Sequence, residues 1–145
     1  MGKARRESDM DWIVRGLVAL WGLFFVWMGV SGLIDPGSYV DTFGVHGDAM
    51  AMNTIRADFS AFFLVAGGAA GWAALRPEHA KMLWLPAGLF AIALAGRILG
   101  VMLGDPFAGS VRESVIVEGM SALLLMAAYV WLARRHPQGI SVSLS

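Results

Sequence analysis

Residues 82–104 read MLWLPAGLFAIALAGRILGVMLG, an apolar run that a single charged residue, Arg97, interrupts. A helix that crosses a membrane needs roughly 17–25 predominantly apolar residues, and this run is long enough if Arg97 is accepted inside it. Residues 114–133 form a second such run, with Glu118 inside it. Because a charge at the centre of a bilayer costs at least about 2.5–3.5 kcal/mol, we expect both residues to have a structural or functional role.

Two further apolar runs, residues 12–34 and 57–75, precede these two. The chain has 145 residues, of which 57% are hydrophobic and 15% charged. A soluble domain usually carries about 25% charged residues. The sequence therefore predicts one all-α domain over residues 1–145. We expect an integral membrane four-helix bundle with antiparallel up-down topology and short polar termini.

Several classes of site and partner are excluded or disfavoured by composition. The chain has no cysteine, which excludes disulfides and cysteine-ligated metals. Its formal net charge is zero and it has no basic patch, so we expect no nucleic-acid partner. His46, with Asp41 and Asp48 nearby in sequence, is interpreted as part of a solvated loop, and no metal site is predicted. No cofactor is predicted either, although bound lipid is compatible with the composition.

Basic residues are divided unevenly between the two sides of the expected bundle. One side would hold Lys3, Arg5, Arg6, Arg15, Arg76, Lys81, Arg134 and Arg135. The positive-inside rule then places both termini in the cytoplasm. The opposite side would carry the longer connection, residues 35–54, which begins with the turn signal Asp35-Pro36-Gly37.

Glycine spacing indicates where helices approach one another. Gly67 and Gly71 form a G-x-x-x-G pair, and Gly96, Gly100 and Gly104 repeat the same spacing twice. Without a hydrophobic driving force between helices in lipid, such small residues permit the close packing that holds a bundle together. Two interpretations remain open at this point: packing within one chain, or a face for a second copy or another membrane subunit.

The four charges Arg56, Asp58, Arg97 and Glu118 are expected in the outer half of the membrane. At about 1.5 Å of rise per residue, Arg97 and Glu118 lie at similar depths on neighbouring helices, which predicts an ion pair between them. Arg56 falls on the same helical stripe as Gly67, so it is expected to point inward. One interpretation is an ion pair that fixes helix register. The other is a pocket for a polar or anionic ligand, since two arginines would surround Glu118.

Three segments together suggest a family. They are residues 53–58 (NTIRAD), residues 96–106 (GRILGVMLGDP) and the lone Glu118. The chain resembles, over roughly residues 12–132, the bacterial four-helix membrane proteins grouped as domain of unknown function 4345. The resemblance implies a four-helix fold in the bacterial inner membrane, with Arg56, Arg97 and Glu118 as its distinctive residues. It implies no reaction, because the family has no established activity.

Three functions are compatible with these observations. The sequence favours, first, an accessory or interaction subunit of a larger membrane complex, whose partners would be lipids and other membrane subunits or a second copy. The second is binding or transport of a polar, anionic or lipid-like ligand in the charged pocket. The third is a membrane enzyme acting on a lipid or quinone-like substrate, with Glu118 as acid or base and Arg97 stabilising charge. The absence of a recognisable catalytic motif favours a non-enzymatic role.

Overall fold

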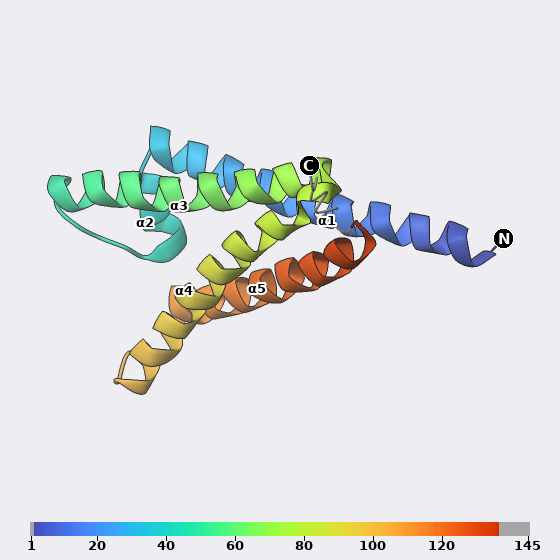
Figure 1. Ribbon diagram of the computed structural model, residues 1–145. Coiled ribbons are helices and arrows are strands. Elements are labelled where there is room, and N and C mark those ends of the chain that lie inside the picture. Colours follow the sequence, from blue (N-terminus) through green and yellow to red (C-terminus); the bar gives the residue numbers. More distant parts are fainter. Residues whose placement is uncertain (1, 137–145) are drawn as a thin grey trace, which may run out of the picture.

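The computed structural model describes residues 2–136, and their side chains from Asp9 onward. The polar C-terminal tail from residue 137, and the side chains of Lys3, Arg5 and Arg6, lie outside this description. In chain order the elements are α1 (Gly2–Ile34), α2 (Gly37–Phe43), α3 (Ala49–Leu75), the 3₁₀ helix η1 (Pro77–Leu83), α4 (Trp84–Met102) and α5 (Gly109–Arg135) (Figure 1). The described residues contain no strand, which confirms the all-α prediction.

Four helical segments are long and apolar enough to cross a membrane. They are Asp9–Ile34, Ala49–Leu75, Pro77–Met102 and Gly109–Arg135. Each contains one of the four runs predicted from hydropathy, apart from two residues at the end of the third, and each extends beyond its run. Helical structure continues into polar sequence because its backbone hydrogen bonds do not depend on apolar side chains.

The long helices are arranged as two pairs. Helix α1 packs along α3, and α4 packs along α5. The pairs meet around η1 and diverge away from it, so that the molecule is narrow at the η1 end and wide at the other (Figure 1).

Side-chain size explains this divergence. The core cluster nearer η1 is rich in alanine, which lets helices approach closely: Val18, Ala70, Ala73, Ala74, Ala80, Leu83, Ala87, Leu125, Ala128 and Leu132. The second cluster, toward the wide end, is mainly aromatic: Phe25, Tyr39, Phe63, Ala66 and Phe90. Aromatic rings hold the pairs apart where alanines let them meet, because cores pack to a nearly constant density.

The connection between the first two long helices contains a helix that hydropathy did not predict. The predicted turn at residues 35–37 is present, with the Asp35 carboxylate accepting a bond from the Gly37 amide at 2.9 Å. Helix α2 follows and ends at Gly44, whose φ of 65° suits glycine. Helix α3 then begins at Ala49 rather than at residue 57, because the Asp48 side chain caps it by accepting from the Ala51 amide at 2.9 Å.

Helix α2 is fixed to the bundle by Tyr39. This side chain is 1% exposed, and its hydroxyl lies 2.9 Å from the Ser60 hydroxyl on α3. Burial raises the pKa of the Tyr39 phenol, with the Ser60 hydrogen bond acting in the opposite direction. The ring packs directly against Gly32, where any larger residue would collide with it.

The predicted glycine positions differ in their surroundings. A Cβ added to Gly67 would lie 2.6 Å from the carbonyl oxygen of Gly22, and one added to Gly22 would lie 3.0 Å from the amide nitrogen of Gly71. These residues therefore allow α1 and α3 to approach closely. On the α4 side, by contrast, Gly96 and Gly104 have no such neighbour within 4 Å, and Gly100 faces only the side chain of Asp105. The three glycines of 96–104 do not mark a close contact between described helices, because α4 lies against α5 alone over much of its length.

Candidate functional site

The ion pair predicted between Arg97 and Glu118 is present. Arg97 Nε donates to Glu118 Oε1 at 2.7 Å, which joins α4 to α5. The Glu118 side chain is 10% exposed and that of Arg97 is 33% exposed. Ser114 and Ser121, four residues before Glu118 and three after it, are also buried, so one polar stripe of α5 faces the interior.

The second carboxylate oxygen of Glu118 is unusual. Oε2 is buried, and no hydrogen-bond donor among the described residues reaches it. A buried polar group without a partner costs about 1–3 kcal/mol, and more when it is charged. The Arg97 interaction therefore satisfies only part of this carboxylate.

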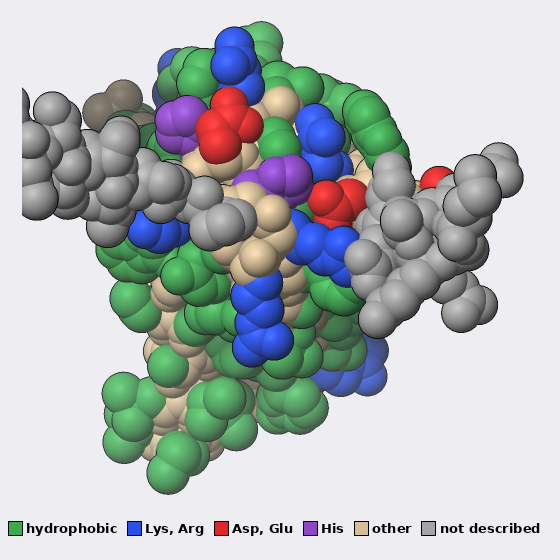
Figure 2. Space-filling model, turned by 45° about the vertical axis from the view of Figure 1, so that its right-hand side comes forward, with side chains coloured by type: hydrophobic (Ala, Val, Ile, Leu, Met, Phe, Trp, Pro, Cys, Tyr) green, Lys and Arg blue, Asp and Glu red, His purple; other side chains and the backbone are tan. Residues whose placement is uncertain are grey.

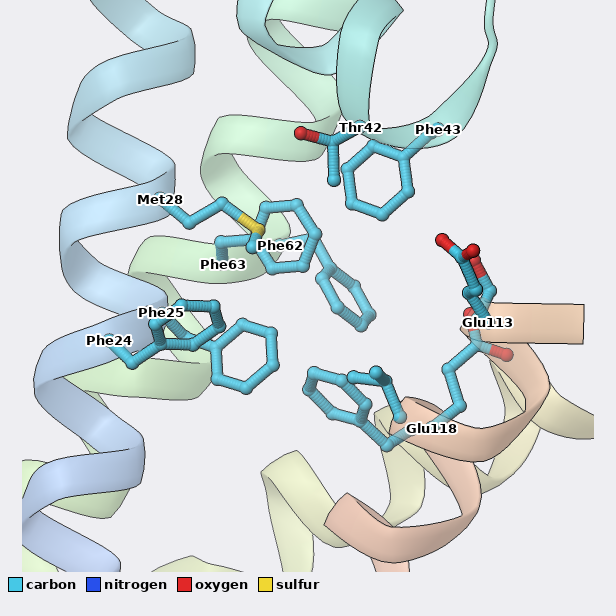
Figure 3. Close-up of a pocket in the computed structure, with 12 residues that line it drawn as sticks. Phe24, Phe25, Met28, Thr42, Phe43, Phe62, Phe63, Glu113 and Glu118 are labelled. Carbon is cyan, nitrogen blue, oxygen red and sulfur yellow. The ribbon is translucent and has the colours of Figure 1, made fainter. Parts of the chain in front are cut away.

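Glu118 lines a cavity of about 210 Å³ between the two helix pairs. Its lining comes from α1, α2, α3, α4 and α5: Phe24, Phe25, Met28, Thr42, Phe43, Phe62, Phe63, Phe90, Glu113, Ser114, Val117 and Glu118. Figure 3 shows the phenylalanines of α1 and α3 on one side of this space and Glu113 and Glu118 on the other. We call it the aromatic cavity.

Ring contacts hold the walls of the aromatic cavity in place. Phe25 stacks on Phe63 with 5.5 Å between ring centroids, which ties α1 to α3. Phe62 reaches Phe90 of α4 at 5.2 Å. Phe43 of α2 stacks on Phe63 at 5.8 Å and covers the space from the α2 side. Aromatic pairs at such distances add about 0.5–1.5 kcal/mol each beyond the area they bury, so the cavity has a well-defined wall.

Two further hollows adjoin this region. One, of about 340 Å³, is lined by Ala93, Gly96, Arg97, Gly100, Asp105, Val111 and Glu118, so that Glu118 borders both spaces. The other, which we call the seam groove, has about 350 Å³ between α1 and α5 and is lined by Trp21, Phe24, Phe25, Val117, Met120, Ser121 and Leu124. The seam groove shares three residues with the aromatic cavity, so the two spaces are adjacent.

The seam itself is bridged by a tryptophan. Trp21 Nε1 donates to Ser121 Oγ at 3.0 Å, and this bond links α1 to α5 near the cavity. Trp21 also packs edge-on against Phe90 at 5.2 Å. The hydrogen-bonded indole therefore lies in the wall of the seam groove, beside Phe90 of the aromatic cavity.

Arg56 and Asp58 do not join the Arg97–Glu118 pair. Both are exposed near the start of α3, and within the described residues neither has a recorded ion pair. The expectation that Arg56 points inward is wrong for a physical reason: the helix pairs diverge toward this end, so neither α4 nor α5 faces it at short range. The cavity lining accordingly contains carboxylates and no basic side chain among the described residues, which removes the basis for expecting an anionic ligand.

Sequence reasoning missed the aromatic wall and Glu113. The doublets Phe24-Phe25 and Phe62-Phe63 were available as a signal, since adjacent aromatics place one ring on the core face of a helix and the other beside it. Among the residues that the structure describes, no group of three or more His, Cys, Asp or Glu residues is placed so that it could hold a metal ion.

The comparison with known families now identifies the chain. The family described as Domain of unknown function (DUF4345) matches residues 13–138. The chain belongs to the DUF4345 family. The matched region contains Arg97, Glu118 and the whole lining of the aromatic cavity. No curated protein and no solved structure matches the chain. Membership of DUF4345 confirms the resemblance noted above and assigns no activity.

Proposed function

We propose that this DUF4345 protein is an integral membrane protein that binds a small, largely apolar ligand in its aromatic cavity. The observation that supports this most directly is the buried Glu118 Oε2, which lacks a donor in a residue that lines a space walled by phenyl rings. Natural ligand sites combine mostly apolar walls with a few convergent polar groups, and this cavity has that composition.

The size of the cavity limits the ligand. An engineered apolar cavity of about 150 Å³ is known to hold benzene. The aromatic cavity, at about 210 Å³, has room for a ring or short branched chain that bears one small polar group. The adjacent seam groove would let such a ligand arrive from between the α1 and α5 helices, and therefore from lipid.

The charge distribution supports an orientation in the bacterial inner membrane. Figure 2 shows charged side chains gathered over one end of the molecule and hydrophobic ones over the rest of this face. The described members near η1 include Asp11, Arg15, Arg76, Glu78, His79, Arg135 and His136. With this end in the cytoplasm, as the positive-inside rule favours, both termini are cytoplasmic and the aromatic cavity lies toward the periplasmic side.

Contacts along the first helix pair support the antiparallel, up-down order of a four-helix bundle. Arg15 Nε donates to the Ala74 carbonyl at 2.8 Å, near the end of α3. Further along α1, Gly22 lies against Gly67, and Gly29 lies against Leu64. As the residue numbers of these contacts increase along α1, those of their partners decrease along α3, as expected for two helices that run in opposite directions.

A cavity-filling variant tests the ligand proposal. The protein is extracted from its native membrane in a mild detergent and weighed by native mass spectrometry. We expect a reproducible small-molecule mass on the wild type that is absent from Val117→Trp, because an indole at this position would occupy the cavity mouth. Ile92→Trp is the matched control, since Ile92 is exposed and lines none of the three hollows. An unliganded wild type, or equal retention in both variants, would contradict the proposal.

A second candidate function, an accessory or interaction subunit of a larger membrane complex, is favoured by α4. No heavy atom lies within 4 Å of a Cβ built on Gly96, and a helical glycine without a neighbour in its own chain permits close approach by another helix; Gly104 lies in the turn after α4. The same mass measurement tests it: a discrete heavier particle containing other chains, reduced by Gly96→Leu, supports an accessory role. A particle of one chain whose mass does not change in Gly96→Leu argues against it.

A further inference from the structure

The walls of the aromatic cavity present one sign of charge. Phenyl rings carry a negative quadrupole on their faces, and cations bind over them at up to about 6 Å from the centroid. The opposite wall carries Glu113 and Glu118. Among the described lining residues there is no lysine or arginine, so the only charged groups of the lining are carboxylates.

The charges near the cavity do not cancel. Arg97 neutralises Glu118 through the bond to Oε1 at 2.7 Å. Glu113 is exposed, lines the same cavity and has no recorded ion pair among the described residues. Asp105 is a further acid, in the hollow on the far side of Glu118. Counted by formal charge, these four residues sum to −2, and to −1 with the exposed Arg112 that precedes Glu113.

We infer that the aromatic cavity selects an organic cation: a small apolar body bearing an ammonium group, held between the phenylalanine wall and the Glu113 and Glu118 carboxylates. This inference rests on the proposed ligand-binding function and adds the chemical class of the ligand. An ammonium in the cavity is attracted by the carboxylates of Glu113 and Glu118, whereas a neutral hydrocarbon is not.

The two carboxylates have different parts in this arrangement. Glu118 is anchored by Arg97, so its position is fixed before a ligand arrives, which lowers the cost of ordering on binding. Glu113 lies five residues nearer the start of α5, is exposed, and has no ion pair among the described residues. Replacing Glu113 therefore alters the charge of the site without disturbing the buried ion pair.

A set of probes with the same shape and different charge tests the inference on the intact protein in maltoside micelles. The cation is benzyltrimethylammonium, its neutral isostere is neopentylbenzene, and the anion is benzylsulfonate. Dissociation constants are measured by calorimetry or by ligand-induced thermal shift, and each is corrected for partition of the probe into micelles. We expect the cation to bind about tenfold tighter than neopentylbenzene, the scale of a desolvated cation–π contact, and the anion to bind most weakly.

Three variants test which carboxylate causes the preference for the cation. Glu113→Gln should weaken cation binding about tenfold and leave neopentylbenzene unchanged, since only the charge is removed. Asp9→Asn is the matched control: it removes an exposed carboxylate about four turns of α1 away from Phe24 and should change neither constant. Glu118→Gln provides a second reading, with circular dichroism to show that the variant is folded.

The outcomes distinguish a wrong ligand class from a cavity that binds no ligand at all. If cation and neutral isostere bind equally in the wild type, and Val117→Trp weakens both, the cavity binds ligands but the cationic class is wrong. Tighter binding of the anion also overturns the cationic class. If no probe binds to folded protein, the proposed function fails with it. The measurement is then repeated in vesicles of phosphatidylcholine and of phosphatidylglycerol, to learn whether the natural ammonium belongs to a lipid headgroup or to a free small molecule. Loss of probe binding only in phosphatidylcholine identifies a lipid headgroup as the ligand. Equal binding in both kinds of vesicle identifies a free small cation.

Discussion

Arg97→Met should destabilise the protein more than Glu118→Gln, although both break the same ion pair. The difference follows from which charge is left behind. In Arg97→Met the remaining carboxylate is nine-tenths buried and already has one unpaired oxygen. Removing one partner of a buried ion pair costs about 3–5 kcal/mol, and we expect Arg97→Met to lower the free energy of unfolding by an amount in this range.

The reverse substitution leaves Arg97, which has a second acid close by. Arg97 is one-third exposed and borders an open hollow that also contains Asp105. In Glu118→Gln the amide oxygen can still accept from Arg97 Nε. Loss of the charge but not of the hydrogen bond should cost about 1–2 kcal/mol. The two variants should therefore differ by about 2 kcal/mol in the free energy of unfolding.

The assay is denaturant-induced unfolding in mixed micelles, followed by far-ultraviolet circular dichroism. Arg56→Met is the matched control, because it removes an exposed arginine with no recorded ion pair among the described residues. Its effect should stay within about 0.5 kcal/mol. The double variant Arg97→Met/Glu118→Met should recover about 2 kcal/mol relative to Arg97→Met, since no unpaired charge remains. Equal losses in the two single variants, or no recovery in the double variant, would refute this reasoning.

Three further predictions test the packing. Gly67→Leu should lower the free energy of unfolding by about 1–3 kcal/mol through overpacking against α1, whereas Gly68→Leu, which faces open space, should not; equal thermal shifts would contradict the close helix approach. Tyr39→Phe should cost about 1–2 kcal/mol and speed amide hydrogen exchange in α2, while unchanged exchange would show that the hydroxyl bond does not hold this helix. Trp27 is 63% exposed, so we expect it to face lipid. Replacing it in Trp27→Phe should therefore reduce the quenching of tryptophan fluorescence by brominated lipid more than Trp21→Phe does. The opposite order would contradict this assignment of the lipid-facing side of α1.

Hydropathy predicted the four long helices because lipid-compatible composition is a local property of each run. The Arg97–Glu118 pair was predictable for a similar reason: rise per residue fixes depth, and helical spacing fixes the face. The early start of α3 was harder, since it depends on a single capping side chain, Asp48, in a polar segment that hydropathy assigns to a connection.

The divergence of the helix pairs could not be read from periodicity, because it depends on which residue sizes meet at each level. The sequence does contain the relevant contrast within one helix. Residues 59–63 of α3 include three phenylalanines, whereas residues 66–74 are mostly alanine and glycine. This change from large to small residues marks the passage from the wide end to the narrow end. Without the partner helices, nothing in it indicates that Arg56 lies beyond the reach of α5.

The seam groove decides which ligand concentration, that in lipid or that in water, governs binding to the cavity. A ligand that enters between α1 and α5 is drawn from the bilayer, so its relevant concentration is its mole fraction in lipid. At about 0.8 kcal/mol per methylene, a body of roughly five methylenes is enriched nearly a thousandfold in lipid over water. An intrinsic affinity in the micromolar range would then look nanomolar when referred to the aqueous phase. The lipid-to-protein ratio, rather than the bulk ligand concentration, would set the occupancy of the cavity.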